Sequence, residues 1–174
     1  MAYVTPGTVA AGDVATAAAW NVVVNDIVAF RVPPMVSATR TAAQTISNAT
    51  WTFISFTSEV FDTANMFTAT DTKITIQTTG IYAVHAQAGI APGNVDFLAK
   101  VEKNAATANA GTPMLASNVR GVTLSDTQTI LSGMLNLTQG DTLHLSVYQS
   151  SGGNYNTAPN PYPTLSAHFV GTTT

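Results

Sequence analysis

Short segments in which apolar and polar residues alternate run through the chain from Val36 onward. Around residue 144, for example, Leu143 and Leu145 alternate with His144 and Ser146. Because a period of two places successive side chains on opposite faces of a β-strand, and turn residues separate the segments, the pattern predicts an all-β sandwich of the jelly-roll kind. Strands are expected near residues 36–41, 51–57, 73–78, 81–89, 96–103, 128–137, 142–149 and 164–170.

The N-terminal residues follow a helical period instead. Asp13 is a suitable N-cap, and Pro33 with Pro34 prevents the helix from continuing. The β-branched run at 22–24 is also compatible with a strand. We expect an arm and amphipathic helix over 1–34, then a head domain over 35–174. The apolar stripe of this helix consists of Trp20, Val23, Val24, Ile27 and Phe30.

The composition excludes several classes of function. Only 9% of the residues are charged, the formal net charge is -3, and the six basic residues are scattered, which argues against nucleic-acid binding. The chain contains no Cys, so disulfides and thiolate metal sites are ruled out. No signal peptide and no apolar run of roughly 20 residues is visible, so we expect cytoplasmic synthesis without membrane insertion.

Motifs for catalysis are missing. The sequence has no Gly-x-Ser-x-Gly elbow, no phosphate-binding loop and no closely spaced pair of carboxylates, so we predict that the protein is not an enzyme and needs no cofactor. A carbohydrate-active enzyme is a disfavoured alternative for the same reason. The aromatic residues of the β-rich segments are expected in the core or in an interface.

The order of motifs in the β-region resembles the jelly roll shared by tumour necrosis factor (TNF) and the globular heads of complement's first component. The sharpest elements are Gly80-x-Tyr82 and Leu137-x-x-Gly140-Asp141; a departure is Asn104, after which a Gly would be usual. The resemblance implies a homotrimer in which one sheet of each sandwich faces the threefold axis. The matching segments are VFDTANMFTA (60–69), KITIQTTGIYAVHAQA (73–88), FLAKVEKNAA (97–106), LSGMLNLTQGDTLHLSVYQ (131–149) and PTLSAHFVG (163–171).

Three strands of the axial sheet would correspond to 81–89, 142–149 and 164–170. Alternation places all three histidines on the non-core face, roughly 5 Å apart between neighbouring strands if their registers coincide. They are interpreted as neutral, hydrogen-bonded interface residues, as a pH-sensitive contact, or as a three-histidine zinc site; no short-range spacing supports the metal, and none is predicted. The predicted trimer interface comprises His85, Gln87, His144, Ser146, Tyr148, Ser166 and His168.

A second resemblance concerns the N-terminal segment TPGTVAAGDVATAAAWNVVVNDI. It is similar to leading segments of tailed-bacteriophage structural proteins, in which a Gly-Asp and Ala-Trp-Asn stretch precedes a head domain. This resemblance implies a virion protein, made in the host cytoplasm, whose N-terminal stripe attaches it to other virion proteins. Alternatively, the stripe bundles three chains on their axis.

The stretch from Ser150 to Pro163 is rich in Gly, Pro and Asn and predicts an exposed, irregular loop. Its residues Tyr155, Asn156, Asn160 and Tyr162 are candidates for a host-facing patch, and a turn-stabilising role for the prolines is the alternative. Our functional hypothesis is a capsid decoration or head-fibre protein. The runner-up is a tail-tip or receptor-binding protein that contacts host surface glycan or protein.

Overall fold

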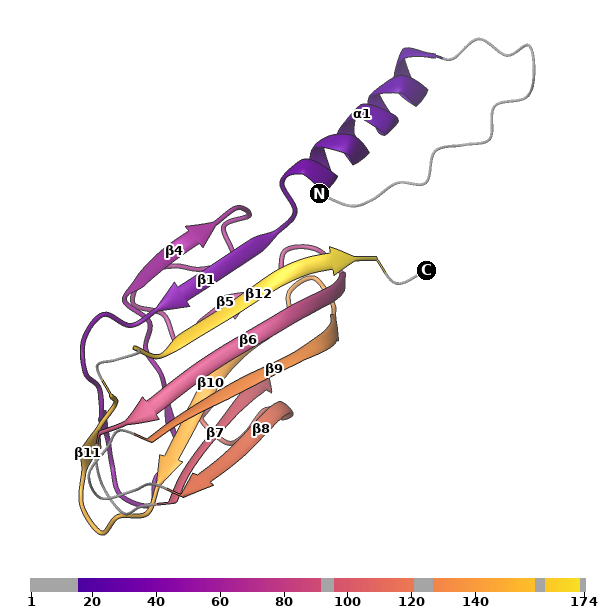
Figure 1. Ribbon diagram of the computed structural model, residues 1–174. Coiled ribbons are helices and arrows are strands. Elements are labelled where there is room, and N and C mark those ends of the chain that lie inside the picture. The colour runs from indigo at the N-terminus through magenta and orange to yellow at the C-terminus, as the bar shows by residue number, and fades with distance from the viewer. Residues whose placement is uncertain (1–15, 92–95, 121–126, 159–161, 173–174) are drawn as a thin grey trace.

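The computed structural model describes residues 16–91, 96–120, 127–158 and 162–172 (Figure 1). One helix precedes a series of strands. The elements are α1 Ala17–Arg31, β1 Met35–Thr39, β2 Thr45–Ile46, β3 Thr52–Phe53, β4 Ser58–Asp62, β5 Lys73–Thr75, β6 Gly80–Ile90, β7 Asp96–Lys103, β8 Thr112–Arg120, β9 Thr127–Leu137, β10 Thr142–Gln149, β11 Tyr155–Asn156 and β12 Thr164–Gly171.

The strands form two antiparallel sheets that pack face to face. The first sheet has the order β4-β1-β12-β6-β9, and the second has the order β3-β10-β7-β8 with β5 also paired to β10. A small third sheet joins β11 to β2. Two stacked sheets joined in this order form a jelly roll, so the predicted all-β fold is confirmed, with strands in all eight predicted regions.

Four strands were not anticipated: β2, β4, β8 and β11. Strands β2 and β11 are two residues long, too short for any period to show. Strand β4 has consecutive exposed residues at an edge of the first sheet, and β8 carries Pro113 at an edge of the second. Edge strands lack the buried face that produces a regular alternation, so the sequence signal is weak.

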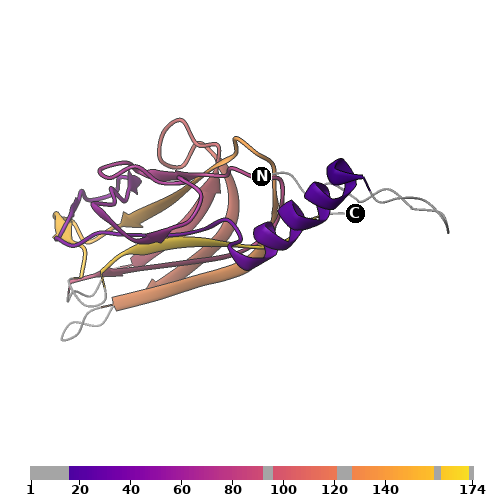
Figure 2. The same cartoon turned by 90° about the horizontal axis from the view of Figure 1, so that it is seen from above.

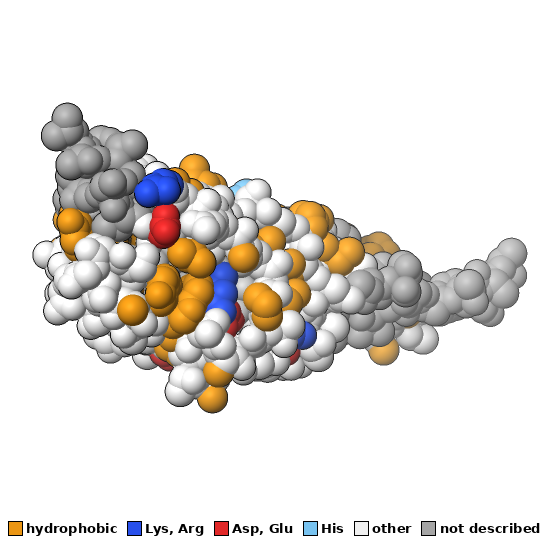
Figure 3. Space-filling view, turned by 90° about the horizontal axis from the view of Figure 1, so that it is seen from below, with side chains coloured by type: hydrophobic (Ala, Val, Ile, Leu, Met, Phe, Trp, Pro, Cys, Tyr) orange, Lys and Arg blue, Asp and Glu red, His pale blue; other side chains and the backbone are white. Residues whose placement is uncertain are grey.

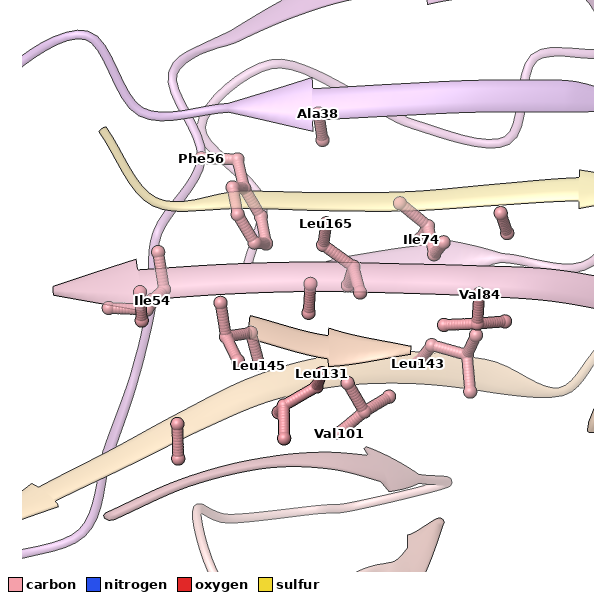
Figure 4. Packing of buried hydrophobic residues seen from close by; sticks show 14 of the residues in the cluster. Ala38, Ile54, Phe56, Ile74, Val84, Val101, Leu131, Leu143, Leu145 and Leu165 are labelled. Carbon is pink, nitrogen blue, oxygen red and sulfur yellow. The ribbon is translucent and has the colours of Figure 1, made fainter. Parts of the chain in front are cut away.

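The core lies between the two sheets (Figure 4). Val84 and Leu165 enter it from the first sheet, and Leu143 and Leu145 enter it from the second, each fully buried. Burying one such side chain contributes about 1.5–3 kcal/mol. This central layer therefore accounts for the apolar residue at every second position of β6, β10 and β12.

The Gly80-x-Tyr82 motif reflects tight packing against the last strand. A Cβ on Gly80 would lie 2.4 Å from the Phe169 ring and 2.5 Å from the carbonyl oxygen of Gly171, so no larger residue fits there without a shift of the backbone. The buried Tyr82 hydroxyl donates a hydrogen bond of 2.8 Å to the Thr78 carbonyl, and burial raises the pKa of Tyr82 to about 12. Both motif residues therefore hold the start of β6 in place.

The second motif forms the turn between β9 and β10. Gly140 adopts a φ of 91°, and the Asp141 carboxylate accepts hydrogen bonds from the Thr138 N–H at 2.8 Å and from the Asn104 amide at 2.7 Å. Burial alone would raise the pKa of Asp141, but these bonds and Lys103 outweigh it and lower the pKa. Asn104 itself takes the left-handed conformation, with a φ of 55°, so no glycine is needed after it.

Helix α1 projects from one end of the sandwich (Figures 1 and 2). The Thr16 hydroxyl accepts a hydrogen bond from the Ala19 N–H at 3.2 Å and so acts as the N-cap. The predicted cap, Asp13, lies outside the described residues, as does the Phe30 side chain. Within the described part of the chain, no helix is long and apolar enough to cross a bilayer.

Candidate subunit interface

The outer face of the first sheet carries four of the predicted interface residues. Register pairs His85 with Ser166, and His168 with Ala83, so the two histidines lie diagonally on adjacent strands β6 and β12. Gln87 lies one pair further along, where its amide donates a 3.4 Å hydrogen bond to the Tyr162 carbonyl. The structure therefore brings His85, Gln87, Ser166 and His168 together.

The other three predicted interface residues lie elsewhere. His144, Ser146 and Tyr148 belong to β10, which pairs in the second sheet and not beside β6 or β12. The expectation that all three histidines occupy neighbouring strands is therefore wrong. Alternation correctly assigned each of them to a non-core face, but it does not determine which sheet a strand joins.

The chain's own loop covers part of the second sheet's outer face. The Glu102 carboxylate, fully buried, accepts hydrogen bonds from the Asn109 N–H at 2.9 Å and the Gly111 N–H at 3.2 Å. It also accepts a hydrogen bond from the Ser146 hydroxyl and forms an ion pair with Lys100 at 3.2 Å. The polar groups around Glu102 are therefore bonded within one chain, which is evidence against a role for Ser146 in subunit contact.

Electrostatics around Glu102 favour its charged form. Burial alone would raise the pKa of this carboxyl, but the hydrogen bonds from Ser146 and the Asn109 N–H, together with Lys100, lower it below its usual value. The Lys100 ammonium lies 4.3 Å from the centre of the Trp51 ring, and Trp51 contacts Tyr148 at 5.4 Å between ring centres. Tyr148 is thus also engaged within the chain.

His144 has a structural environment. It is 5% exposed and stacks on Phe53 at 4.4 Å between ring centres. Burial, followed by the charge of Lys73, lowers the pKa of His144 and keeps the ring neutral. His144 lines an open depression of about 530 Å³. The other lining residues are Phe53, Thr72, Lys73, Asn104, Ala105, Ala106 and Thr142.

Exposed apolar side chains distinguish the first sheet. Ile130 and Met134 on β9 are 72% and 58% exposed, Val170 on β12 is 57% exposed, and Phe61 on β4 is 37% exposed. Register places Met134 opposite Ala83 and Ile130 opposite Gln87, on the face that carries His85. Phe61 was expected in the core or in an interface, whereas Ile130 and Met134 were not anticipated, although the alternation of residues 128–137 could have found them.

Charged groups are missing from the centre of this face. Among the outward-facing residues of β1, β12, β6 and β9 that the structure describes, none is Lys, Arg, Asp or Glu. In contrast, the side of the molecule viewed from below shows acidic and basic side chains among apolar and uncharged polar ones (Figure 3). Apolar residues with depleted charge are typical of the buried centre of a protein interface.

His168 lies at the edge of the apolar area. Its ring contacts Phe61 at 5.5 Å between ring centres, in an edge-on arrangement. Burial, followed by the charge of His85, lowers the pKa of His168. Within the described residues, no group of three or more His, Asp or Glu side chains is arranged to hold a metal ion.

The described part of the stretch from Ser150 to Pro163 contains a short strand. Tyr155 and Asn156 form β11, paired with β2, and the Tyr155 ring packs against the core. Asn156 is exposed and accepts a 3.0 Å hydrogen bond from Thr45, Tyr162 is half-buried, and Asn160 lies outside the described residues. The expectation of an irregular, exposed loop is therefore wrong for Tyr155.

Comparison with known proteins identifies the fold. No protein-family model and no curated protein sequence matches the chain. Among solved structures, the globular domain of zebrafish complement 1qA is 14% identical with a TM-score of 0.55, covering 80% of this chain and 99% of that domain. Murine APRIL is 12% identical with a TM-score of 0.58, covering 78% and 98%, and Eiger TNF from S. frugiperda is 14% identical with a TM-score of 0.58, covering 81% and 96%. The chain therefore has the jelly-roll fold of TNF and complement globular domains, as its motifs predicted.

Proposed function

We propose that the protein is a homotrimeric structural module of a bacteriophage virion, most directly a capsid decoration or head-fibre protein. The observation that carries the proposal is the contrast between the two outer faces of the sandwich. The first sheet exposes Ile130, Met134 and Val170 without a charged residue facing outward on β1, β12, β6 or β9, whereas the second sheet satisfies Glu102 and Lys100 internally. Three copies that meet through their first sheets would remove these apolar side chains from water.

The phage assignment rests on the N-terminal segment and on the absence of chemistry in the described residues. The segment TPGTVAAGDVATAAAWNVVVNDI (5–27) resembles leading segments of phage structural proteins, and it precedes a head in which no metal cluster is found among the described side chains. Function of this kind is adhesion through buried surface. A trimer presents three copies of any attachment segment, so that weak individual contacts combine into firm binding.

Native mass measurement tests the trimer. At pH 8 the full chain should have the mass of three 18.1 kDa chains. The variant Met134→Lys should be monomeric with an unchanged far-ultraviolet circular dichroism spectrum, because three ammonium groups would lose water at the interface. Ala106→Lys, at an exposed site in the loop between β7 and β8, is the matched control and should remain trimeric. A trimeric Met134→Lys variant would show that this face is not the interface.

Labelled antibodies on virions test the location. Signal over the head supports decoration of the capsid, and signal at the tail supports the alternative, a tail-tip or receptor-binding protein. For that alternative, Asn156 and Tyr162 remain the described candidates for contact with host glycan or protein, since both keep exposed surface.

A further inference from the structure

Among the described residues, helix α1 packs against no strand to any appreciable extent (Figure 1). Trp20, Val24 and Ile27 are 64%, 44% and 54% exposed. The helix has only 15 residues, and β-branched valines lower its intrinsic stability. Because isolated helices of about 12–15 residues are marginally stable in water, this helix requires a partner surface.

The spacing of the apolar residues indicates the shape of that partner. Trp20, Val23 and Ile27 follow one another at intervals of three and four residues, which is the a/d spacing of a heptad. Ala18 lies on the opposite side, because successive residues are about 100° apart around a helix. A seam at this spacing, widened by the exposed Val24 beside it, fits between two other helices of a three-stranded bundle.

The seam connects to the proposed trimer face. Only residues 32–34 separate α1 from β1, and the Phe169 N–H of β12 donates a 2.9 Å hydrogen bond to the Pro34 carbonyl. Val32 and Val170, each 57% exposed, lie on either side of this junction. Exposed apolar residues therefore extend from the helix onto the first sheet. A second copy of the chain that covers the first sheet would therefore also lie beside the helix.

We propose that the α1 helices of three chains form a parallel three-stranded coiled coil on the axis of the head trimer, with Trp20, Val23 and Ile27 in the seam. The helices are parallel because a threefold axis relates the three heads. This inference rests on the proposed trimer, and it assigns the apolar stripe to assembly of the protein itself. Attachment to the particle then falls to residues outside the stripe.

Cysteine cross-linking tests the coil, since the chain contains no Cys of its own. The full-length variants Ile27→Cys and Ala18→Cys are oxidised at pH 8 and separated without reductant. At Ile27→Cys about two thirds of the chains should become disulfide-linked dimers, the maximum for pairs within a trimer, independent of protein concentration. At Ala18→Cys, on the outside of the coil, linkage should be slight and should increase with concentration.

Fluorescence provides a second readout. In the Trp51→Phe variant the only remaining tryptophan is Trp20, whose emission should lie at shorter wavelength in the trimer than in a monomeric Met134→Lys background. A trimeric native mass with equal linkage at the two cysteine positions, or with solvent-like Trp20 emission, overturns the coiled coil and leaves the proposed head trimer standing. A monomeric native mass of the unmodified chain overturns both.

Discussion

Replacing Glu102 by glutamine should destabilise the sandwich by about 3 kcal/mol at pH 7, because the substitution leaves a buried cation without its counter-charge and a buried donor without an acceptor. Each oxygen of the carboxylate accepts from two donors. Oε1 faces Lys100 and the Gly111 N–H at 3.2 Å each, and Oε2 faces Ser146 and the Asn109 N–H. A glutamine can supply only one accepting oxygen.

The magnitude follows from the groups left behind. The glutamine amide can donate to the rotatable Ser146 hydroxyl, so the Asn109 N–H is the donor that loses its partner, at about 1–3 kcal/mol. Lys100, only 8% exposed, also loses its counter-charge. Removing one partner of a buried pair costs about 3–5 kcal/mol; the contacts of Lys100 with Asn109 and Trp51 place this case at the lower end.

Urea unfolding, followed by far-ultraviolet circular dichroism at a fixed chain concentration, measures the loss. Concentration is fixed because assembly contributes to the apparent stability. The double variant Lys100→Met with Glu102→Gln should be destabilised by less than the sum of the two single variants, since the buried charge is removed with its partner. A loss below about 1 kcal/mol for Glu102→Gln, or additive effects in the double variant, would refute this account of the buried network.

Other predictions concern the turns and the histidines. Asn104→Ala should cost about 1–3 kcal/mol in urea unfolding, because alanine disfavours the positive φ and loses the bonds to Asp141 and Thr142; Asn104→Gly should cost less if the backbone matters most. Gly80→Ala should lower the thermal midpoint through its clash with Phe169 and Gly171, and an unchanged midpoint would contradict the packing argument. Because burial lowers the pKa of His168, the unfolded chain binds a proton at this residue more readily than the folded chain, so the free energy of unfolding should fall as pH drops below about 6.5. His168→Gln should reduce this dependence of stability on pH. An equal pH dependence in the two proteins would exclude His168 as its source.

The sequence predicted the strands that pack on both sides of the core. β6, β10 and β12 have long alternating patterns because every second residue is buried between the sheets. Strand β11 could not be predicted, since it exists only because Tyr155 and Asn156 pair with β2, far away in the sequence. Such a strand is determined by tertiary contacts and carries no local signal.

The sequence predicted on which face of its strand each candidate histidine lies, but not which sheet the strand belongs to. Parity placed His85, His144 and His168 away from the core, which the structure bears out. It could not separate them, because the pairing of β10 with β7 depends on contacts between distant residues. The burial of Glu102 could not be predicted from the sequence either, since it requires the loop at 104–111 to fold back over the sheet.

The low surface charge bears on which outer face of the sandwich associates with other chains. With 9% charged residues, the chain cannot rely on electrostatic repulsion to keep apolar surface apart, so the exposed face of Ile130 and Met134 favours association. If the protein has the virion role proposed above, assembly of the trimer and its attachment to a particle are linked. A trimer that presents three attachment segments binds a particle more tightly than one chain does, and thermodynamic reciprocity requires the particle to favour the trimer by the same factor. Even a weak head trimer in solution would therefore become a firm one on the surface that it covers.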